Sequence, residues 1–194
     1  RPAERLVRHL MRVTLDDDAT PHYGMFLGAG AVVHGTEYAH REIHARGLRD
    51  DFSLFLGTLR TAWGVVRGEE AFTAPTRLGL SLDGHAAGAA DTLILAVSTL
   101  DRLAFGMRPF WGTGAGPLRV TLIEQHAPRF LPTFLSIIAG RPSRRARAGG
   151  HYRSHNAREL ELALAGELNL DGELLTVAQR ARLTASPPLV FLRP

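Results

Sequence analysis

The most specific chemical feature of the sequence is an acidic turn in its last third. The segment Leu168-Asn169-Leu170-Asp171-Gly172-Glu173 alternates apolar and polar residues and then runs into Asp-Gly, the strongest short signal for a two-residue β-hairpin. The same pattern occurs earlier, in Leu80-Ser81-Leu82-Asp83-Gly84-His85. Both segments therefore predict tight turns between antiparallel strands. The two turns differ in the residue that follows them, which is His85 after the earlier turn and Glu173 after the later one. This difference is the first indication that the later turn takes part in chemistry.

A second group of carboxylates is the run Asp16-Asp17-Asp18. A calcium loop of the EF-hand type would need alternating oxygen ligands and a distal glutamate after these residues, and the sequence does not supply them. We therefore interpret the run as a polar turn between strands, with contact to a divalent ion as the alternative.

The segment His40-Arg41-Glu42-Ile43-His44 places two imidazoles four residues apart, and His34 and Glu37 lie close by in the sequence. A zincin motif would need glutamate where Arg41 stands. A solvated helical face, on which Glu37 and Arg41 form an i,i+4 pair, is therefore favoured over a metal site.

Two glycine-rich segments, residues 28–33 and 112–117, match the dinucleotide-binding pattern only in part. The third glycine of GxGxxG is replaced by Val33 in the first segment and by Pro117 in the second. We interpret both segments as bends or loops. The GxSxG elbow of serine hydrolases is absent from the sequence as well.

Residues 141–153 contain five arginines and no acidic residue. Proline, serine and two glycines within the segment predict a loop. A solvated loop is the favoured interpretation. The alternative is contact with anionic lipid headgroups, worth up to about 1 kcal/mol per basic residue, through Arg141, Arg144, Arg145 and Arg147.

Composition excludes several classes of function. The chain of 194 residues has no cysteine, and its 23 basic residues are all arginine. Disulfide scaffolds, thiolate metal sites and cysteine nucleophiles are therefore excluded, as are lysine Schiff bases and GxxxxGK[ST] nucleotide loops. The net charge of +4 is too small for a nucleic-acid signature. The longest apolar run, residues 130–140, is too short to span a membrane, and without a leader at Arg1 we expect part of a soluble cytoplasmic protein.

The sequence predicts mainly β-strands around the candidate residues. Residues 23–33 predict a strand that bends near Gly28 and Gly30, and residues 92–97 predict a short buried strand. Period-two alternation around residues 118–122 and 160–164 predicts half-buried strands. Further strands are expected over residues 174–177, 180–184 and 189–192.

Two segments have helical spacing instead. In residues 50–68 the apolar residues recur at helical intervals between Asp50 or Asp51 as N-cap and Gly68 as the stop. Residues 126–140 repeat the pattern, with Pro128 in the first turn. The apolar stripe expected there consists of Phe130, Leu131, Phe134, Leu135 and Ile138.

In this order, the segments resemble the C-terminal domain of lipid kinases of the diacylglycerol kinase and sphingosine kinase type. The likeness extends over almost the entire chain, and its sharpest motif is the turn that ends in Glu173. The segments that carry it are Met11-Arg12-Val13-Thr14-Leu15-Asp16, Phe26-Leu27-Gly28-Ala29-Gly30-Ala31-Val32-Val33, Leu82-Asp83-Gly84, Asn169-Leu170-Asp171-Gly172-Glu173 and Pro188-Leu189-Val190-Phe191-Leu192.

The resemblance implies an antiparallel β-sandwich with a few helices over residues 1–194, forming one half of a two-domain enzyme. The ATP-binding half, with its Gly-Gly-Asp-Gly-Thr loop, would belong to the same or another chain. Glu173 would act as general base on a lipid hydroxyl or help to place Mg²⁺ near ATP, while Asp171 and Gly172 would shape the turn and Asp171 would share the metal work. The implied partners are the lipid substrate and the inner membrane surface. A homodimer remains an alternative, and no nucleic-acid partner is expected.

One departure from the family pattern concerns the stretch that follows the buried strand. Family members carry a proline and an Asp-Asp-Gly there, whereas this chain has only glycines, Gly114 and Gly116 among them. A non-catalytic lipid-binding module or an interaction domain with the same fold is therefore the alternative to a lipid kinase domain. Alone, the chain is expected to be inactive, because it lacks the nucleotide half of the site.

Overall fold

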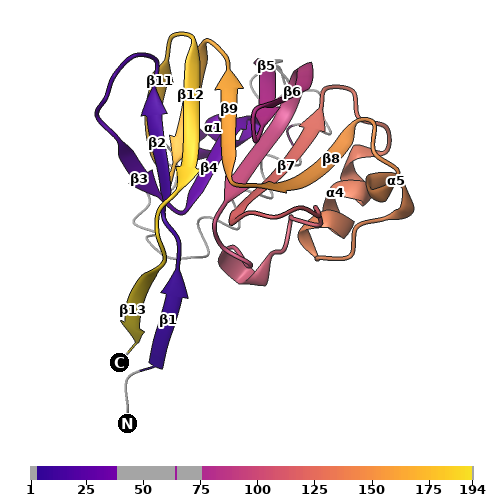
Figure 1. Cartoon of the computed structure of the whole chain (residues 1–194). Coiled ribbons are helices and arrows are strands. Elements are labelled where there is room, and N and C mark those ends of the chain that lie inside the picture. The colour runs from indigo at the N-terminus through magenta and orange to yellow at the C-terminus, as the bar shows by residue number, and fades with distance from the viewer. Residues whose placement is uncertain (1–3, 39–63, 65–75, 194) are drawn as a thin grey trace.

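Antiparallel strands make up most of the computed structural model, which describes residues 4–38, 64 and 76–193 (Figure 1). The strands are β1 (Glu4–Arg8), β2 (Met11–Leu15), β3 (His22–Gly24), β4 (Phe26–Gly30), β5 (Thr76–Leu82), β6 (His85–Ser98), β7 (Leu118–Glu124), β8 (Tyr152–Ala157), β9 (Glu159–Ala163), β10 (Gly166–Leu170), β11 (Glu173–Val177), β12 (Arg180–Ala185) and β13 (Leu189–Arg193). The helices are α1 (Ala31–Tyr38), η3 (Ala104–Gly106), α4 (Phe130–Ile138) and α5 (Arg144–Arg147). The strands expected from alternation in the C-terminal third are thus confirmed.

The long strand β6 divides the main sheet into two arms. One edge of β6 pairs first with β5 and then with β4, while β7 pairs along its opposite edge. We call the strands β8, β7, β6, β4, β10 and β11 the first arm and the strands β5, β9, β12, β2 and β3 the second arm. Because β5 and β4 leave β6 at successive positions, the sheet curls and its two arms diverge.

The main hydrophobic core lies between the arms and draws on both. Leu27 and Leu95 of the first arm and Val13, Leu162 and Leu183 of the second are all completely buried in one cluster. Strands of the second arm alternate buried and exposed residues, as expected for a sheet with one face toward the core. The fold is therefore the mainly antiparallel β-sandwich with few helices that the sequence predicts.

The strand expected over residues 23–33, with a bend near Gly28 and Gly30, does break at Gly30, but residues 31–33 are wrong as strand because helix α1 begins at Ala31. Gly30 has φ 70°, and a Cβ atom there would lie 2.4 Å from the carbonyl oxygen of Leu93. Only glycine fits this reversal of backbone direction. Helix α1 then packs against β4, β6 and β10.

The helix expected near residues 126–140 is confirmed as α4, but it begins at Phe130, so Pro128 precedes its first turn. The expected apolar stripe is confirmed only in part, because Phe130 and Phe134 pack against a hydrophobic cluster whereas Leu135 does not. Thr133 and Ile137 are the buried residues of α4, while Leu135 is 44% exposed. The reason is that α4 faces a second cluster around Ile123 and Tyr152, and this contact orients the helix.

Strands β1 and β13 form a separate two-stranded ribbon that extends from the body of the sandwich (Figure 1). Glu4 is paired with Arg193 at its far end. The motif from His40 to His44 lies outside the described residues, as does the expected helix over residues 50–68 except for Gly64, which is helical. Within the described part of the chain, no helix has the length and apolar character needed to cross a membrane.

Candidate functional site

The turn at Asp171 joins β10 to β11 and is held by the chain entering β4. Asp171 has φ 49°, and its N–H donates to the carbonyl oxygen of Phe26 at 2.9 Å. Its two carboxylate oxygens accept separate backbone hydrogen bonds, from the N–H of Met25 to Oδ2 at 2.7 Å and from the N–H of Phe26 to Oδ1 at 2.9 Å. The neighbouring Gly24 leaves room for this contact, since a Cβ there would lie 2.8 Å from Oδ2. The carboxylate of Asp171 is therefore engaged by the protein backbone.

Two other aspartates make the same arrangement, which we call an aspartate clasp. The N–H of Asp83 donates to the carbonyl oxygen of Glu159 at 3.0 Å, and Oδ1 of Asp83 accepts from the N–H groups of Arg158 and Glu159 at 2.8 and 2.9 Å. The carboxylate of Asp16 accepts from the N–H groups of residues 178, 179 and 180 at 2.7–2.9 Å. Asp16, Asp83 and Asp171 all have φ near 50°.

The three clasps lie where the chain passes from one arm to the other. Asp171 binds the passage from β3 to β4, Asp83 binds the passage from β8 to β9, and Asp16 binds the passage from β11 to β12. At each passage the backbone leaves one ladder before it enters the next, so its N–H groups need other acceptors. The primary role that the geometry gives to these aspartates is to hold the two arms together.

Glu173 differs from these aspartates because its side chain has no such partner. It is the first residue of β11, paired with Leu170 across the hairpin, and its side chain is exposed. No hydrogen bond or ion pair joins the Glu173 carboxylate to the rest of the described chain. The clasped turn thus fixes the backbone of Glu173 while leaving its carboxylate open to a ligand.

Asn169 is a residue of this site that the sequence did not single out. It is 2% exposed, its Oδ1 accepts the N–H of Gly172 at 3.1 Å, and in the sheet it is paired with Gly28 of β4. Gly28 is itself restricted, because a Cβ there would lie 2.3 Å from Val32 of α1. The turn therefore rests on the junction between β4 and α1. The sequence did contain a signal for this residue, because asparagine occupies the position that Ser81 has in the other Asp-Gly segment.

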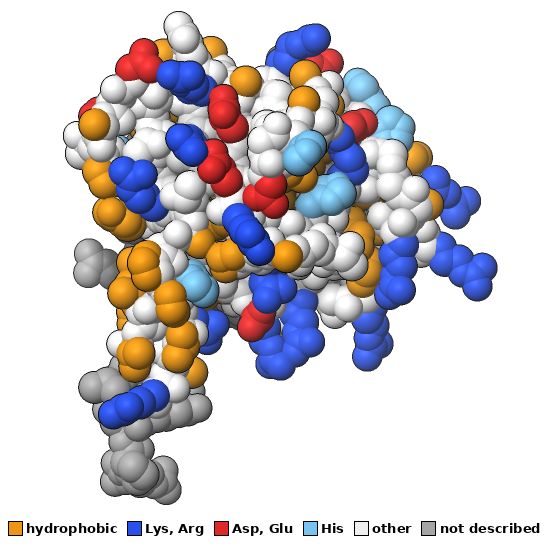
Figure 2. Space-filling model, viewed as in Figure 1, with side chains coloured by type: hydrophobic (Ala, Val, Ile, Leu, Met, Phe, Trp, Pro, Cys, Tyr) orange, Lys and Arg blue, Asp and Glu red, His pale blue; other side chains and the backbone are white. Residues whose placement is uncertain are grey.

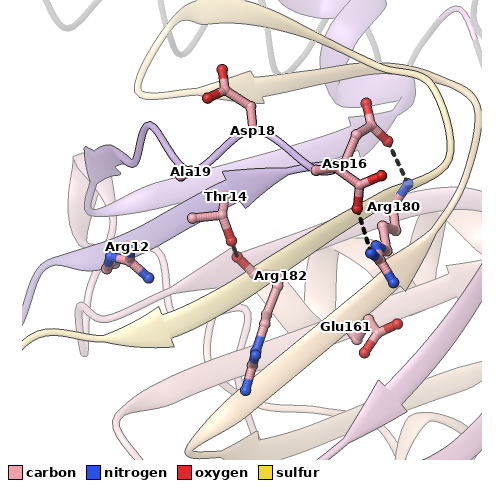
Figure 3. A pocket seen from close by; sticks show the side chains of 9 residues that line it. Arg12, Thr14, Asp16, Asp18, Ala19, Glu161, Arg180 and Arg182 are labelled. Atoms are coloured by element: carbon pink, nitrogen blue, oxygen red, sulfur yellow. Dashed lines mark hydrogen bonds and ion pairs between the residues drawn. The ribbon is translucent and has the colours of Figure 1, made fainter.

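The run Asp16-Asp17-Asp18 is confirmed as a polar turn at the end of β2 (Figure 3). Backbone hydrogen bonds, first that from Ala178, lower the pKa of Asp16, and the bond from the Thr20 N–H lowers that of Asp18. A pocket beside the turn is lined by Arg12, Thr14, Asp16, Asp17, Asp18, Ala19, Glu161, Arg180 and Arg182. Its charges compensate each other, as in the 2.7 Å ion pair of Asp17 with Arg180. Among the described residues no group of three His, Asp or Glu could hold a metal ion.

The basic segment is not the simple loop expected for residues 141–153. It contains the helical turn α5, in which the Ser143 hydroxyl oxygen accepts from the N–H of Ala146 at 3.3 Å, and it leads into β8. Arg153 belongs to β8 and forms a 2.8 Å ion pair with Glu124. The arginines that remain exposed around α5 are Arg141, Arg144, Arg145 and Arg147.

The glycines of residues 112–116 are confirmed as part of a loop, which lies against β8. A Cβ at Gly112 would lie 2.4 Å from the backbone nitrogen of His155, and one at Gly116 would lie 2.1 Å from the carbonyl carbon of Ala157. Thr113 forms an isolated bridge with His155. Close backbone contact thus requires glycine at these positions, where the resembling family carries acidic residues.

The sequence matches no known family model and no curated protein. The structure, however, is similar to a candidate diacylglycerol kinase from Bacillus anthracis strain Sterne, with a TM-score of 0.56 and 11% identity over 93% of this chain and 55% of that one. A second such structure from this organism gives a TM-score of 0.53 at 11% identity, covering 93% and 55% of the two chains. A diacylglycerol kinase from the same strain gives 0.50 at 10% identity, covering 92% and 52%.

The fold is therefore that of diacylglycerol-kinase-like lipid kinases, as the sequence resemblance implies. This chain spans about half the length of the solved structures that it matches.

Proposed function

We propose that this chain is the lipid-substrate half of an ATP-dependent lipid kinase that phosphorylates the hydroxyl of a diacylglycerol-like lipid. The observation that carries this proposal is an exposed, unpartnered carboxylate, Glu173, at the start of a strand whose preceding turn is held by the Asp171 clasp. A fold shared with diacylglycerol kinases supports the choice of reaction.

In the proposed reaction Glu173 accepts the proton of the lipid hydroxyl. The hydroxyl oxygen forms its bond to the γ-phosphorus as the bond from that phosphorus to the β–γ bridging oxygen breaks, and ADP leaves with the bonding electrons. Asp171 is a positioning residue in this scheme, because its oxygens are engaged by the N–H groups of Met25 and Phe26. Asn169 supports the same turn through the N–H of Gly172.

The proposal assigns ATP and Mg²⁺ to an ATP-binding domain of the same or another chain. The sequence has no lysine for a phosphate-binding loop. Within the described residues no cluster of three potential ligands offers a complete metal site, so the proposed reaction contains no step through a metal held by this chain. Mg²⁺ bound with ATP would spread the charge of the transferring phosphoryl group. Glu173 would face this nucleotide site across the interface of the two domains.

A matched pair of variants tests the role of Glu173 in the native protein that includes the ATP-binding domain. Glu173→Gln removes the base with little change of shape, and turnover of diacylglycerol in mixed micelles is expected to fall by about 100-fold. Glu167→Gln changes an exposed glutamate of β10 and should leave turnover unaffected. Unchanged turnover in Glu173→Gln would overturn the proposed function.

The glycine loop of residues 112–116 favours a second candidate, a lipid-binding module without catalysis. Its backbone contact with β8 leaves no room for the acidic side chains of the resembling family. A diacylglycerol-induced rise in Tm without any ATP-dependent lipid phosphorylation would support this module. Absence of both effects would instead favour an interaction domain without a lipid ligand.

A further inference from the structure

Helix α4 presents an apolar side to solvent. Its sequence, Phe-Leu-Pro-Thr-Phe-Leu-Ser-Ile-Ile, contains no charged residue. Thr133 and Ile137 face the core, so the residues on the other side of the helix point outward. Leu135 is 44% exposed there, Pro132 is exposed, and Leu131 is half-buried. A surface helix normally carries polar residues on this side.

Exposed arginines lie on the segments next to helix α4. No acidic residue occurs between Glu124 and Glu159. Gly140, just after α4, lies against the side chain of Arg108, which brings a distant arginine to the same corner. The exposed arginines of the corner are Arg108, Arg129, Arg141, Arg144, Arg145 and Arg147. Figure 2 shows basic side chains projecting from the end of the molecule where Figure 1 places α4 and α5.

Several arginines elsewhere on the sandwich have an acidic partner, whereas no ion pair of the corner arginines with a described residue occurs. On the second arm Arg180 pairs with Asp17 at 2.7 Å and Arg182 pairs with Glu159 at 2.7 Å. Beside α5, Glu124 pairs with Arg153 and His151 and not with a corner arginine, and the side chain of Arg147 donates to the carbonyl oxygen of Pro142. The corner therefore combines uncompensated positive charge with exposed apolar surface.

We propose that the α4–α5 corner docks on the surface of a bilayer that contains anionic lipids. The apolar side of α4, with Leu135 at its centre, enters the boundary between headgroups and acyl chains, and the arginines bind lipid phosphates around it. An apolar helix side next to a cluster of exposed arginines suits a bilayer, because nucleic acid would offer phosphates but no acyl region. This inference is independent of the proposed phosphoryl transfer.

Vesicle flotation of the 194-residue chain tests this docking surface. The probe is a vesicle of equal parts phosphatidylglycerol and phosphatidylcholine, compared with phosphatidylcholine alone. The chain should float with the anionic vesicles only, and less so as salt rises. Arg144→Gln combined with Arg145→Gln should weaken binding by about 30-fold, as expected from about 1 kcal/mol per arginine. Leu135→Gln should weaken binding without any change of net charge.

A charge-matched control separates this surface from the total charge of the protein. Arg12→Gln combined with Arg77→Gln removes two exposed arginines of the second arm and should leave vesicle binding unchanged. Equal losses in the two double variants would overturn the proposal. So would equal binding to neutral vesicles, or binding to single-stranded RNA in place of either vesicle. Circular dichroism and Tm of each variant establish that a loss of binding does not reflect unfolding.

Discussion

The two Asp-Gly turns of this protein share a backbone and differ in what surrounds it. Residues 83 and 84 have φ values of 49° and 79°, and residues 171 and 172 have 49° and 98°. Each aspartate donates its N–H to a neighbouring carbonyl and accepts two N–H groups. The turn at Asp171, however, is preceded by buried Asn169 and followed by the open carboxylate of Glu173. The same turn is thus used twice in the fold, and the residues that we propose for chemistry flank only one of the two copies.

The clasp at Asp16 shows which part of this device is essential. No glycine follows Asp16, and no two-residue hairpin is formed there, yet its carboxylate also accepts backbone N–H groups at a passage between the arms. The common requirement is therefore an aspartate with positive φ opposite a strand-to-strand passage. A glycine follows the aspartate only where a two-residue hairpin requires a second residue with positive φ.

The sharpest expected difference between the two turns is their response to Asp→Asn. Asp171 uses both oxygens, so the amide group of Asp171→Asn must face a backbone N–H, whereas Asp83 uses only Oδ1 and Asp83→Asn can turn its amide outward. We expect Asp171→Asn to cost about 2 kcal/mol, or roughly 6 °C in Tm, and Asp83→Asn at most about 0.5 kcal/mol. Thermal unfolding measures both.

Turnover extends this test to function. If the proposed two-domain lipid kinase is correct, Asp171→Asn should also lower its turnover, because the substitution loosens the backbone that carries Glu173, while Asp83→Asn should leave turnover unchanged. Equal Tm losses in the two variants would contradict the different use of their oxygens. Equal turnover would contradict a positioning role for Asp171.

The residues before the two turns should differ by a smaller amount. Asn169 is 2% exposed and accepts the Gly172 N–H, so Asn169→Ala is expected to cost about 1–2 kcal/mol in the free energy of unfolding. Ser81→Ala, at the equivalent half-buried position, should stay within about 0.5 kcal/mol. Urea unfolding of both variants measures the difference. An unchanged free energy of unfolding in Asn169→Ala would mean that Asn169 does not support the turn.

The turns could be predicted from the sequence because their signals are local. Asp-Gly after an alternating strand specifies a hairpin within six residues, and this pattern pointed to Asp171, Gly172 and Glu173. The clasp itself could not be predicted, since Asp171 meets Met25 across 146 positions of sequence. Nothing local in the aspartate identifies that partner.

The same distinction explains the corrections in the fold. The alternation of β9 and β12 predicts their buried faces, because period two is a property of each strand alone. The direction of α4 depends instead on where Ile123 and Tyr152 lie, and the end of β4 depends on the carbonyl of Leu93 behind Gly30. Both features are determined by packing between segments that are distant in the sequence, so local patterns do not predict them.

Replacing the glycines of the two turns should affect both equally. Gly84 and Gly172 have positive φ, and nothing lies within 4 Å of a Cβ added at either position. Gly84→Ala and Gly172→Ala should therefore each cost only the backbone strain, about 1 kcal/mol or roughly 3 °C in Tm. Differential scanning calorimetry of the pair provides the measurement. A clear difference would show that the flanks also alter the turn backbone.

The smallest effect is expected in acid, at the third clasp. Hydrogen bonds from residues 178–180 lower the pKa of Asp16 in the folded protein below its ordinary value of 3.8. The ionised carboxylate therefore stabilises the fold above about pH 4, and this contribution is lost as the pH falls through the lowered pKa. Between about pH 6 and pH 2.5, the Tm of Asp16→Asn should consequently fall by less than the Tm of the wild-type protein.

The exposed neighbour Asp17 provides the control, because Asp17→Asn removes only an ion pair with Arg180 and should follow the wild-type pH dependence closely. If Asp16→Asn instead paralleled the wild type over this range, its carboxylate would not be an acid-sensitive link between the arms, and the likeness among the three clasps would be one of geometry alone.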